Sequence, residues 1–352
     1  MRSIRSMEVH DEAQVGAVRR AVHTFAGEIG FTEREQAEID IVVQELGTNA
    51  ARYAAGGGWI HFTKPVGAEP GLEIFYWDKG PGIPDLERAA RDGVSTGGSL
   101  GGGLGAMRRL MDEFEVYSTV REPGRHSSSL RSSQRRTMHG TAILCRKWVA
   151  AARLSPQAHA TTAKRLGVWS RPVSGEDLNG DAYFVRRRGA RMLLAVIDGL
   201  GHGQGAHAAS QVALEVLGQW QGEPLEDLFR DTHEALRTTR GAVMGAALID
   251  TARGTLDYAG VGNIEVRILN APEPARPLSH HGTLGARMER FRVWSHKWAE
   301  GTLVIMASDG LSATWDLADY PELPNKSLQM IAGVLMRDYG RDSDDATILI
   351  AR

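Results

Sequence analysis

Glycine is not spread evenly along this chain, because four short segments are enriched in it. The chain has 41 glycines, and they concentrate at 56–58, 80–82, 97–105 and 199–205. Glycine tolerates positive φ and lets the backbone approach a ligand closely, so clusters of it favour loops built around a bound group. The clustering therefore indicates nucleotide or phosphate chemistry.

The length of the chain favours two domains. It has 352 residues, and a domain typically takes roughly 100–200. A small, polar, alanine-rich stretch that contains Pro156 reads as a linker. We therefore expect a first domain over 1–149, a linker over 150–165 and a second domain over 166–352.

Composition excludes several classes of protein. The net charge of −2 gives no overall bias toward nucleic acid or a membrane surface. Cys145 is the only cysteine, so no disulfide framework can form and a reducing compartment is favoured. No apolar run approaches the roughly 20 residues that span a bilayer. We expect a cytoplasmic protein that binds neither nucleic acid nor a membrane.

Apolar spacing predicts an α+β chain in both halves. Thr32 and Glu35 form a capping box at the start of a long helix. In the first half, helices are expected at 11–26, 32–54 and 104–112, and strands at 59–64, 72–77, 114–119 and 141–148. In the second half, strands are expected at 182–186, 192–197, 242–249, 255–259, 265–269, 302–307 and 346–350, and helices at 204–220, 225–236 and 326–336. The Ser- and Arg-rich segment 121–136 reads as a polar loop, with a basic contact surface as the alternative.

Three elements in the first half could form a nucleotide site. Glu45 and Asn49 are four residues apart, so both side chains lie on one helix face. Asp78 follows a strand and begins DKGPGI, where an acid can accept a hydrogen bond from an adenine amino group. The run 97–105 then opens a helix, whose backbone N–H groups suit phosphate. Each signal alone is more often a solvated helix face, a turn or a linker, but their order and spacing favour ATP binding.

The segments ELGTNAARYA, DKGPGI and GGSLGGGLGAMRRLMDEFEV resemble the GHKL ATPase fold shared by gyrase and histidine kinases. More narrowly, they resemble the small serine kinases of bacterial partner-switching systems, RsbT and its relatives, over about residues 5–148. The resemblance implies that Glu45 is the general base, that Asn49 holds Mg²⁺ and that Asp78 binds adenine. It also implies pocket-shaping and lid roles for five glycines: Gly80, Gly82, Gly101, Gly103 and Gly105. The chain has no GxxxxGK[ST] motif and no phosphate-accepting histidine region, so neither a P-loop enzyme nor a histidine kinase proper is expected.

Aspartates in the second half recur at the ends of predicted strands. Asp181 opens one strand, Asp198 ends another, Asp309 follows a third, and the pair Asp344 and Asp345 precedes the last. Mg²⁺ and Mn²⁺ prefer such oxygen ligands, and zinc-type Cys/His spacing is missing from the sequence. Asp-Gly is also a common turn dipeptide. Four acids at strand ends nevertheless favour a two-metal phosphatase site.

The segments VSGEDLNGDAYF, LLAVIDGLGHGQGA, YAGVGN, TLVIMASDGLSATW and DDATILIAR resemble PPM-type serine/threonine phosphatases of the SpoIIE branch, nearest to RsbX, over about 166–352. The resemblance implies that Asp198 bridges two metals, that the Gly199 carbonyl binds one, and that Asp309 and Asp344 bind the other. It also implies that Asp181 holds a metal or a water on a metal.

Two positions depart from the phosphatase pattern or stay open. Tyr183 and Phe184 stand where many relatives carry a second acidic residue, which puts a third metal site in doubt. His202 could bind phosphate or give a proton to the leaving serine. A supporting role behind the metal ligands is favoured for it.

Together the two resemblances predict an N-terminal GHKL-type α/β sandwich and a C-terminal PPM-type α-β-β-α sandwich. The expected function is a bifunctional switch that uses ATP with Mg²⁺, and Mg²⁺ or Mn²⁺ in the phosphatase, on Ser or Thr of a STAS-domain antagonist. The expected setting is a sigma-factor pathway or a stressosome-like assembly, and a homodimer stays open. Two alternatives are an ATP-dependent, anti-sigma-like binding module fused to a phosphatase, and a phosphatase whose ATP site senses nucleotide.

Overall fold

The computed structural model describes most of the chain as two compact units. The first is formed mainly by residues 2–163, and the second by residues 164–321 and 327–352. The described residues are 4–54, 56–66, 70–89, 103–120, 139–150, 165–288 and 291–352. The serine- and arginine-rich segment, most of the expected linker and Gly101 lie outside them. None of the helices in the described ranges has the length and apolar character that crossing a bilayer requires.

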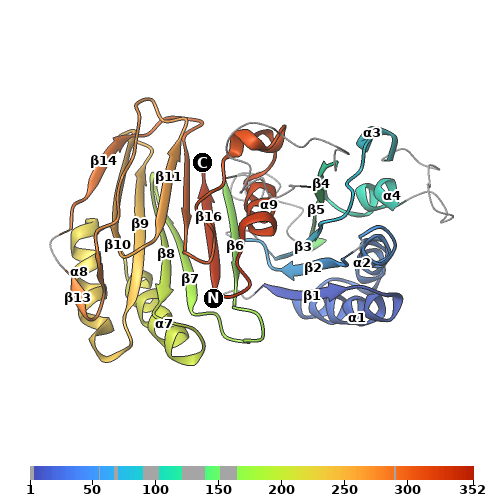
Figure 1. Cartoon of the computed structure of the whole chain (residues 1–352), viewed down its shortest axis with the longest axis horizontal. Coiled ribbons are helices and arrows are strands. Elements are labelled where there is room, and N and C mark those ends of the chain that lie inside the picture. Colours follow the sequence, from blue (N-terminus) through green and yellow to red (C-terminus); the bar gives the residue numbers. More distant parts are fainter. Residues whose placement is uncertain are drawn as a thin grey trace, which may run out of the picture. The chain divides into compact units, whose positions relative to one another are not determined.

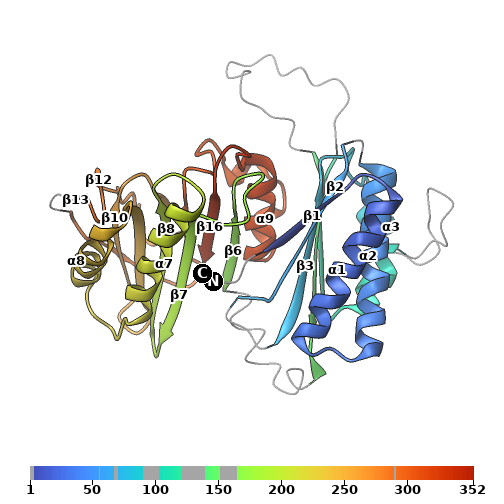
Figure 2. The same ribbon diagram turned by 90° about the horizontal axis from the view of Figure 1, so that it is seen from below.

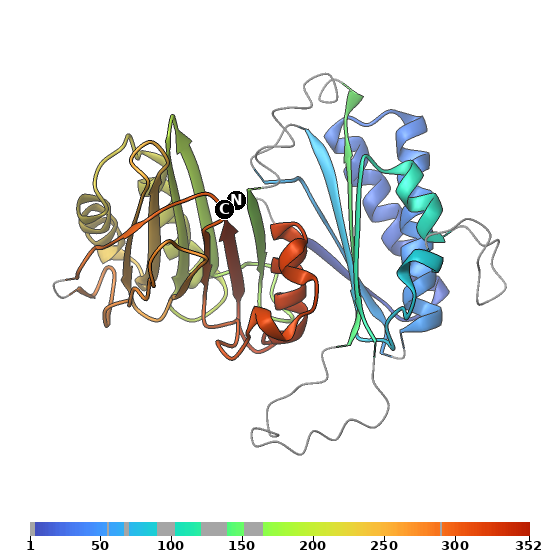
Figure 3. The same cartoon turned by 90° about the horizontal axis from the view of Figure 1, so that it is seen from above.

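The first unit is built on one antiparallel sheet of order β1-β2-β3-β5-β4. Its strands are β1 (Arg5–Val9), β2 (Gly58–Thr63), β3 (Gly71–Asp78), β4 (Glu113–Thr119) and β5 (Gly140–Trp148). Its helices are α1 (Glu12–Ile29), α2 (Glu33–Tyr53), α3 (Leu86–Ala89) and α4 (Gly103–Leu110). The helices lie on one face of the sheet (Figures 2 and 3).

The two long helices of this unit begin and end as local sequence dictates. Asp11 caps α1 by accepting from the N–H of Gln14, and Gly30 ends that helix in the left-handed region at φ 103°. The predicted capping box of α2 is confirmed, because Thr32 and Glu35 satisfy each other's backbone N–H groups. The apolar stripes of both helices pack on the sheet as one core.

A buried lysine connects α2, α4 and β5. Lys147 is only 3% exposed. Its ammonium lies 2.8 Å from a carboxylate oxygen of Glu38 on α2, and it donates to the carbonyl of Leu110, the last residue of α4, at 2.5 Å. The pKa of Glu38 is lowered, first by the hydrogen bond from Lys147 and further by that residue's charge. This contact therefore fixes the helix that follows the glycine run against the sheet.

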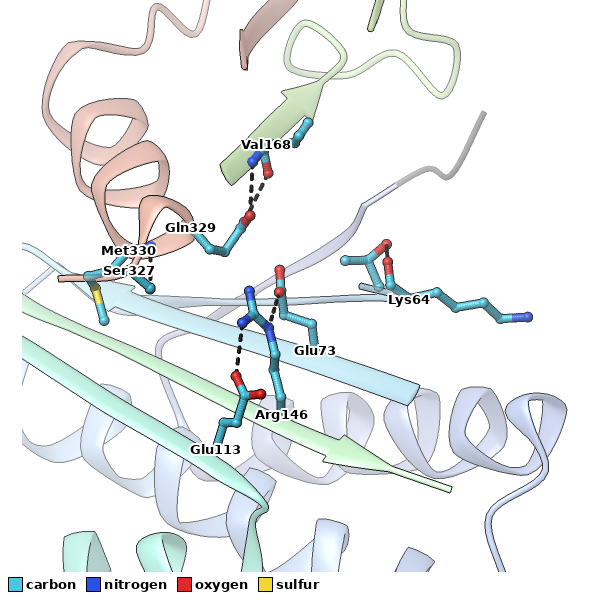
Figure 4. Close-up of polar contacts among 9 residues, drawn as sticks. Lys64, Glu73, Glu113, Arg146, Val168, Ser327, Gln329 and Met330 are labelled. Carbon is cyan, nitrogen blue, oxygen red and sulfur yellow. Dashed lines mark hydrogen bonds and ion pairs between the residues drawn. The ribbon is translucent and has the colours of Figure 1, made fainter. Parts of the chain in front are cut away.

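An ion cluster joins three neighbouring strands of the same sheet. Arg146 on β5 donates through Nε to Glu73 on β3 at 2.7 Å and through Nη1 to Glu113 on β4 at 3.0 Å, as Figure 4 shows. The Arg146 and Glu73 side chains are almost fully buried. The two carboxylates raise the pKa of Arg146 despite its burial, so the guanidinium stays charged.

The second unit contains two larger sheets. One has the order β14-β10-β9-β8-β7 and the other β11-β15-β16-β6 (Figure 1). The strands of the first are β7 (Asp181–Arg188), β8 (Arg191–Gly199), β9 (Ala242–Asp250), β10 (Thr255–Val261) and β14 (Trp294–Lys297). Those of the second are β6 (Leu166–Arg171), β11 (Glu265–Leu269), β15 (Leu303–Ala307) and β16 (Ala346–Ala351), and a small ribbon joins β12 (Gly282–Thr283) to β13 (Arg287–Met288).

Helices cover the outer faces of this pair of sheets. They are α7 (Gln204–Gly218), α8 (Leu225–Ala235) and α9 (Leu328–Tyr339), with short 3-10 turns at Leu236–Thr238, Leu317–Asp319 and Leu323–Asn325. In Figure 2, α7 and α8 lie on one side of the sheets and α9 on the other. The unit is therefore an α-β-β-α sandwich, and the predicted fold class of both halves is confirmed.

Several short strands were not expected from the sequence. β1 is an edge strand of five residues with charged Arg5 and Glu8, and its partner β2 lies some fifty residues away in sequence. β6, β14 and the β12–β13 ribbon were missed in the same way. The edge strand β1 and the shortest of these strands lack a clear alternating pattern, and β1, β6 and β14 are defined by pairing with distant parts of the chain.

Candidate functional site

Glu45 on α2 faces the start of α4. Glu45 and Asn49 are both half-buried and one helical turn apart. A methyl group at Gly103 would lie 3.1 Å from a carboxylate oxygen of Glu45. Gly103 is the first residue of α4, and Gly105 is buried in the same turn. Glu45 therefore lies next to the first turn of α4.

Asp78 is held by three donors at the end of β3. Its Oδ2 accepts from the Tyr76 hydroxyl at 2.6 Å, and its Oδ1 accepts from the backbone of Gly80 at 2.7 Å and of Thr141 at 3.2 Å. Burial and the charge of Asp78 raise the pKa of Tyr76, which stays a donor. A carboxylate has about four acceptor sites, so this fixed group can still accept a bond from an adenine amino group.

The two glycines after Asp78 lie in tight backbone surroundings. A methyl group at Gly80 would come within 2.9 Å of Asp78 Oδ1, and one at Gly82 within 2.2 Å of the Thr119 carbonyl. Gly82 also has φ 79°, which disfavours other residues. The Gly80 carbonyl bonds to His139 Nδ1 at 2.7 Å. Both glycines are required by the path of the loop next to Asp78.

In the second unit, the four predicted aspartates come from the ends of strands in both sheets. Asp181 and Asp198 are paired across β7 and β8. Asp309 follows β15 and Asp344 precedes β16, and those two strands are neighbours. The two sheets of the sandwich therefore bring their acidic ends to one place.

Burial and mutual repulsion raise the pKa values of three of these carboxylates. Burial, followed by repulsion from Asp309, Asp344 and Asp345, raises the pKa of Asp198 to about 7. Burial and then Asp198 raise the pKa of Asp181, and burial and then Asp344 raise that of Asp309. A concentration of negative charge of this kind is stabilised by a cation.

Neutral side chains orient two of the acids. Ser308 Oγ donates to Asp181 Oδ2 at 2.5 Å, and Asn263 donates to Asp309 Oδ2 at 2.8 Å. Neither residue was predicted to have a role. Both lie in segments that carry the phosphatase resemblance, Ser308 beside Asp309 and Asn263 at the end of YAGVGN, and that position was the available signal.

Asp344 and Asp345, which precede β16, make different hydrogen bonds. Asp345 is buried, and its two oxygens accept from the N–H of Val173 at 2.8 Å and of Gly180 at 2.9 Å. Asp344 is half-buried and accepts only from the backbone of Asp345 at 2.9 Å. Asp345 therefore fixes the loop that leads into β7, whereas the Asp344 carboxylate has fewer hydrogen-bond partners among the described residues and could take up a cation.

Gly199 and His202 lie between Asp198 and α7. A methyl group at Gly199 would come within 2.2 Å of the Ala206 carbonyl, so only glycine fits there. The His202 side chain is 63% exposed, and its Nδ1 lies 3.5 Å from Glu176. It is among the groups that lower the pKa of Asp345. The histidine is thus at the rim of the acidic cluster.

The donor set of the second unit fits hard divalent cations. Carboxylates and a backbone carbonyl are the ligands that Mg²⁺ and Mn²⁺ accept. Among the described residues, no three His, Cys, Asp or Glu side chains already stand at metal-ligand spacing. Mg²⁺ usually keeps several waters and takes only one or two carboxylates, so the cluster fits metals that also hold water.

Known proteins match each unit separately. The model of the histidine kinase-like ATPase domain matches residues 9–126, and that of stage II sporulation protein E matches 188–352. The serine/threonine-protein kinase RsbT of Bacillus subtilis (strain 168) is 38% identical over 117 residues, which are 33% of this chain and 87% of that protein. The phosphoserine phosphatase RsbX of the same organism is 24% identical over 180 residues, 51% of this chain and 89% of that protein.

A solved structure is also similar to part of the chain. It comes from work on the bacterial stressosome as a modular system adapted to control secondary messenger signalling. The two are 32% identical with a TM-score of 0.51, over 53% of this chain and 98% of the other.

Proposed function

Because this chain belongs to the family of the kinase RsbT through its first unit and carries a stage II sporulation protein E domain in its second, we propose that it is a bifunctional partner-switching regulator. It phosphorylates Ser or Thr of a STAS-domain antagonist with ATP and removes the same phosphate. The proposal is carried by the convergence of four repelling aspartates in the second unit. In the first unit, taken by itself, it is supported by an Asp78 fixed by hydrogen bonds and by a Glu45 close to the start of α4.

In the kinase half, Asp78 would hold the adenine and Glu45 would accept the proton of the attacking hydroxyl. The closeness of Glu45 to the first residue of α4 supports this, because phosphate groups are favoured at that helix terminus. Asn49 would hold Mg²⁺ with its amide oxygen. Gly80, Gly82, Gly103 and Gly105 would shape the pocket, and Gly101 has the same proposed role.

In the phosphatase half, Asp198, the Gly199 carbonyl, Asp309, Asp344 and Asp181 would hold Mg²⁺ or Mn²⁺. When bound, these cations neutralise charge on the phosphoryl oxygens and lower the pKa of the attacking water. Ser308, Asn263 and Asp345 would keep the acids in place through their hydrogen bonds. His202 would lie where a leaving serine needs a proton.

Phosphatase activity is tested with p-nitrophenyl phosphate and purified full-length protein in Mn²⁺, Mg²⁺ or EDTA. Asp198→Ala should abolish metal-dependent hydrolysis. Asp227→Ala is the matched control, because that aspartate is partly exposed on α8 and forms a surface ion pair with Arg230. Hydrolysis that continues in EDTA or in Asp198→Ala would refute a metal-dependent phosphatase.

Kinase activity is tested by mass spectrometry of STAS-domain proteins incubated with ATP and Mg²⁺. Glu45→Ala should lose phosphate transfer, whereas Glu28→Ala, at an exposed position on α1, should keep it. A partner complex that needs ATP but survives Glu45→Ala would favour the anti-sigma-like binding module instead. Phosphatase rates that change with nucleotide in Glu45→Ala would favour the nucleotide sensor.

The setting of this activity is also part of the proposal. We propose a stressosome-like assembly or a sigma-factor pathway in the cytoplasm, and the similarity to a protein from a stressosome study supports the first of these settings. Size-exclusion chromatography with light scattering distinguishes a monomer from the homodimer that the resemblance leaves open.

A further inference from the structure

An arginine outside the acidic cluster lies beside the turn that carries His202. Arg240 comes just before β9, whose first residue, Ala242, pairs with Gly199 at the end of β8. The carbonyl of Gly241 accepts from the N–H of Leu200 at 3.1 Å. The backbone at Arg240 is therefore tied to the segment that follows Asp198.

The side chain of Arg240 extends over the start of α7. A methyl group at Gly205, the second residue of that helix, would come within 2.4 Å of Arg240 Nε, and one at Gly201 within 3.6 Å of Nη1. Glycine at 205 thus leaves the space that the guanidinium occupies. The same guanidinium lies beside the turn 201–203, so its charge is held between the helix and the end of β8.

The charge of Arg240 is not neutralised by a neighbour. Within the described part of the chain, Arg240 makes no ion pair and no side-chain hydrogen bond, and it is exposed. By contrast, nearby Arg237 is paired with Glu234 at 3.1 Å. Gly203, the N-cap residue of α7, has no side chain that could accept from the helix, so no N-cap side chain binds the first N–H groups of α7. An unpaired guanidinium and these N–H groups both favour an anion.

We infer that Arg240 binds the phosphoryl group of the phosphoserine or phosphothreonine substrate at the mouth of the aspartate cluster. This inference rests on the proposed phosphatase function and extends it to substrate recognition. A guanidinium presents two parallel donors to phosphate oxygens, which lysine cannot reproduce. Leu200, which is 39% exposed beside it, gives the same rim an apolar contact for a protein substrate.

The test compares Arg240→Gln, Arg240→Lys and Gly205→Ala in the full chain with the matched control Arg237→Gln. With a phosphoserine peptide and Mn²⁺, kcat/KM should fall by about ten- to hundredfold in Arg240→Gln, since charge-assisted hydrogen bonds are lost. The kcat/KM of Arg240→Lys should lie between those of the wild type and Arg240→Gln. Gly205→Ala should also lower it, because the new methyl displaces the guanidinium while alanine favours the helix. Arg237→Gln should match the wild type.

A binding measurement separates this inference from the proposed function. Inorganic phosphate is titrated by calorimetry into the Mn²⁺-loaded wild type and Arg240→Gln, and the affinity should be lower in the variant. Equal affinity, or no phosphate binding by the wild type, overturns the inference whether or not turnover occurs. Failure of the proposed function shows instead as absent metal-dependent turnover in the wild type.

Discussion

The contact between Glu38 and Lys147 gives a quantitative prediction for the first unit. Glu38→Ala removes the carboxylate that lies 2.8 Å from the Lys147 ammonium, and Lys147 is only 3% exposed. Among the described residues, the ammonium then keeps its hydrogen bond to the Leu110 carbonyl. Losing a hydrogen bond to a buried charged group costs about 1.5–3 kcal/mol. The better helix propensity of alanine offsets only about a few tenths of a kcal/mol of this loss in stability. We therefore expect a clear local destabilisation of α4 and β5.

Hydrogen–deuterium exchange of the full chain measures this directly. A change of 1.4 kcal/mol is about a factor of ten in an opening equilibrium, so peptides from 104–110 and 140–148 should exchange about ten- to a hundredfold faster in Glu38→Ala. Peptides from β9, in the other unit, serve as an internal reference. Arg34→Ala is the matched control: Arg34 pairs with the same glutamate, but its side chain is 89% exposed, and exposed pairs contribute little.

The effect should depend on pH in one direction. The pKa of Glu38 is lowered below its ordinary value of 4.5, so the stabilisation is fully present above that pH and is lost as pH falls through the lower value in the folded state. Exchange rates of wild type and Glu38→Ala should converge in acid. Equal protection in the two proteins at neutral pH would refute the reasoning, as would a difference that grows on acidification.

Three further predictions follow from single contacts. Tyr76→Phe should weaken ATP binding roughly tenfold, because Asp78, the carboxylate that we propose binds adenine, loses a donor; calorimetry should show no loss in the control Tyr258→Phe. Asp345→Asn should destabilise the second unit by about 1.5–3 kcal/mol in urea unfolding, since an amide NH₂ would meet a backbone N–H, whereas Asp342→Asn, 94% exposed, should change nothing. Burial raises the pKa of the Cys145 thiol, so a disulfide reagent should modify it only after denaturation, and rapid modification of the native protein would contradict its burial.

The sequence was most informative where a pattern is local. The capping box at Thr32 follows from residues three apart, and the long helices and central strands follow from apolar spacing, so their existence could be predicted. β1 could not, because an edge strand with two charged residues is defined by its partner β2. Pairing between distant segments carries no local signal.

The candidate sites likewise combine features that the sequence revealed with features that only the fold brings together. Acidic residues at strand ends were visible in the sequence, and so was the one-turn spacing of Glu45 and Asn49. The groups that donate hydrogen bonds to these acids could not be identified from the sequence. Ser308 is 127 positions from Asp181, and Tyr76 donates to Asp78 only in the folded strand. Arg240 is a further case, because its position over α7 depends on a glycine 35 residues earlier.

The opposing activities that we propose for the two units on one partner can be tested in a single experiment. A STAS-domain partner is incubated with ATP, Mg²⁺ and Mn²⁺, and its phosphorylated fraction is followed by mass spectrometry with wild type, Glu45→Ala and Asp198→Ala. The account predicts no phosphorylation with Glu45→Ala, accumulation with Asp198→Ala, and a lower steady level with the wild type. The same phosphorylated fraction with all three proteins would contradict it.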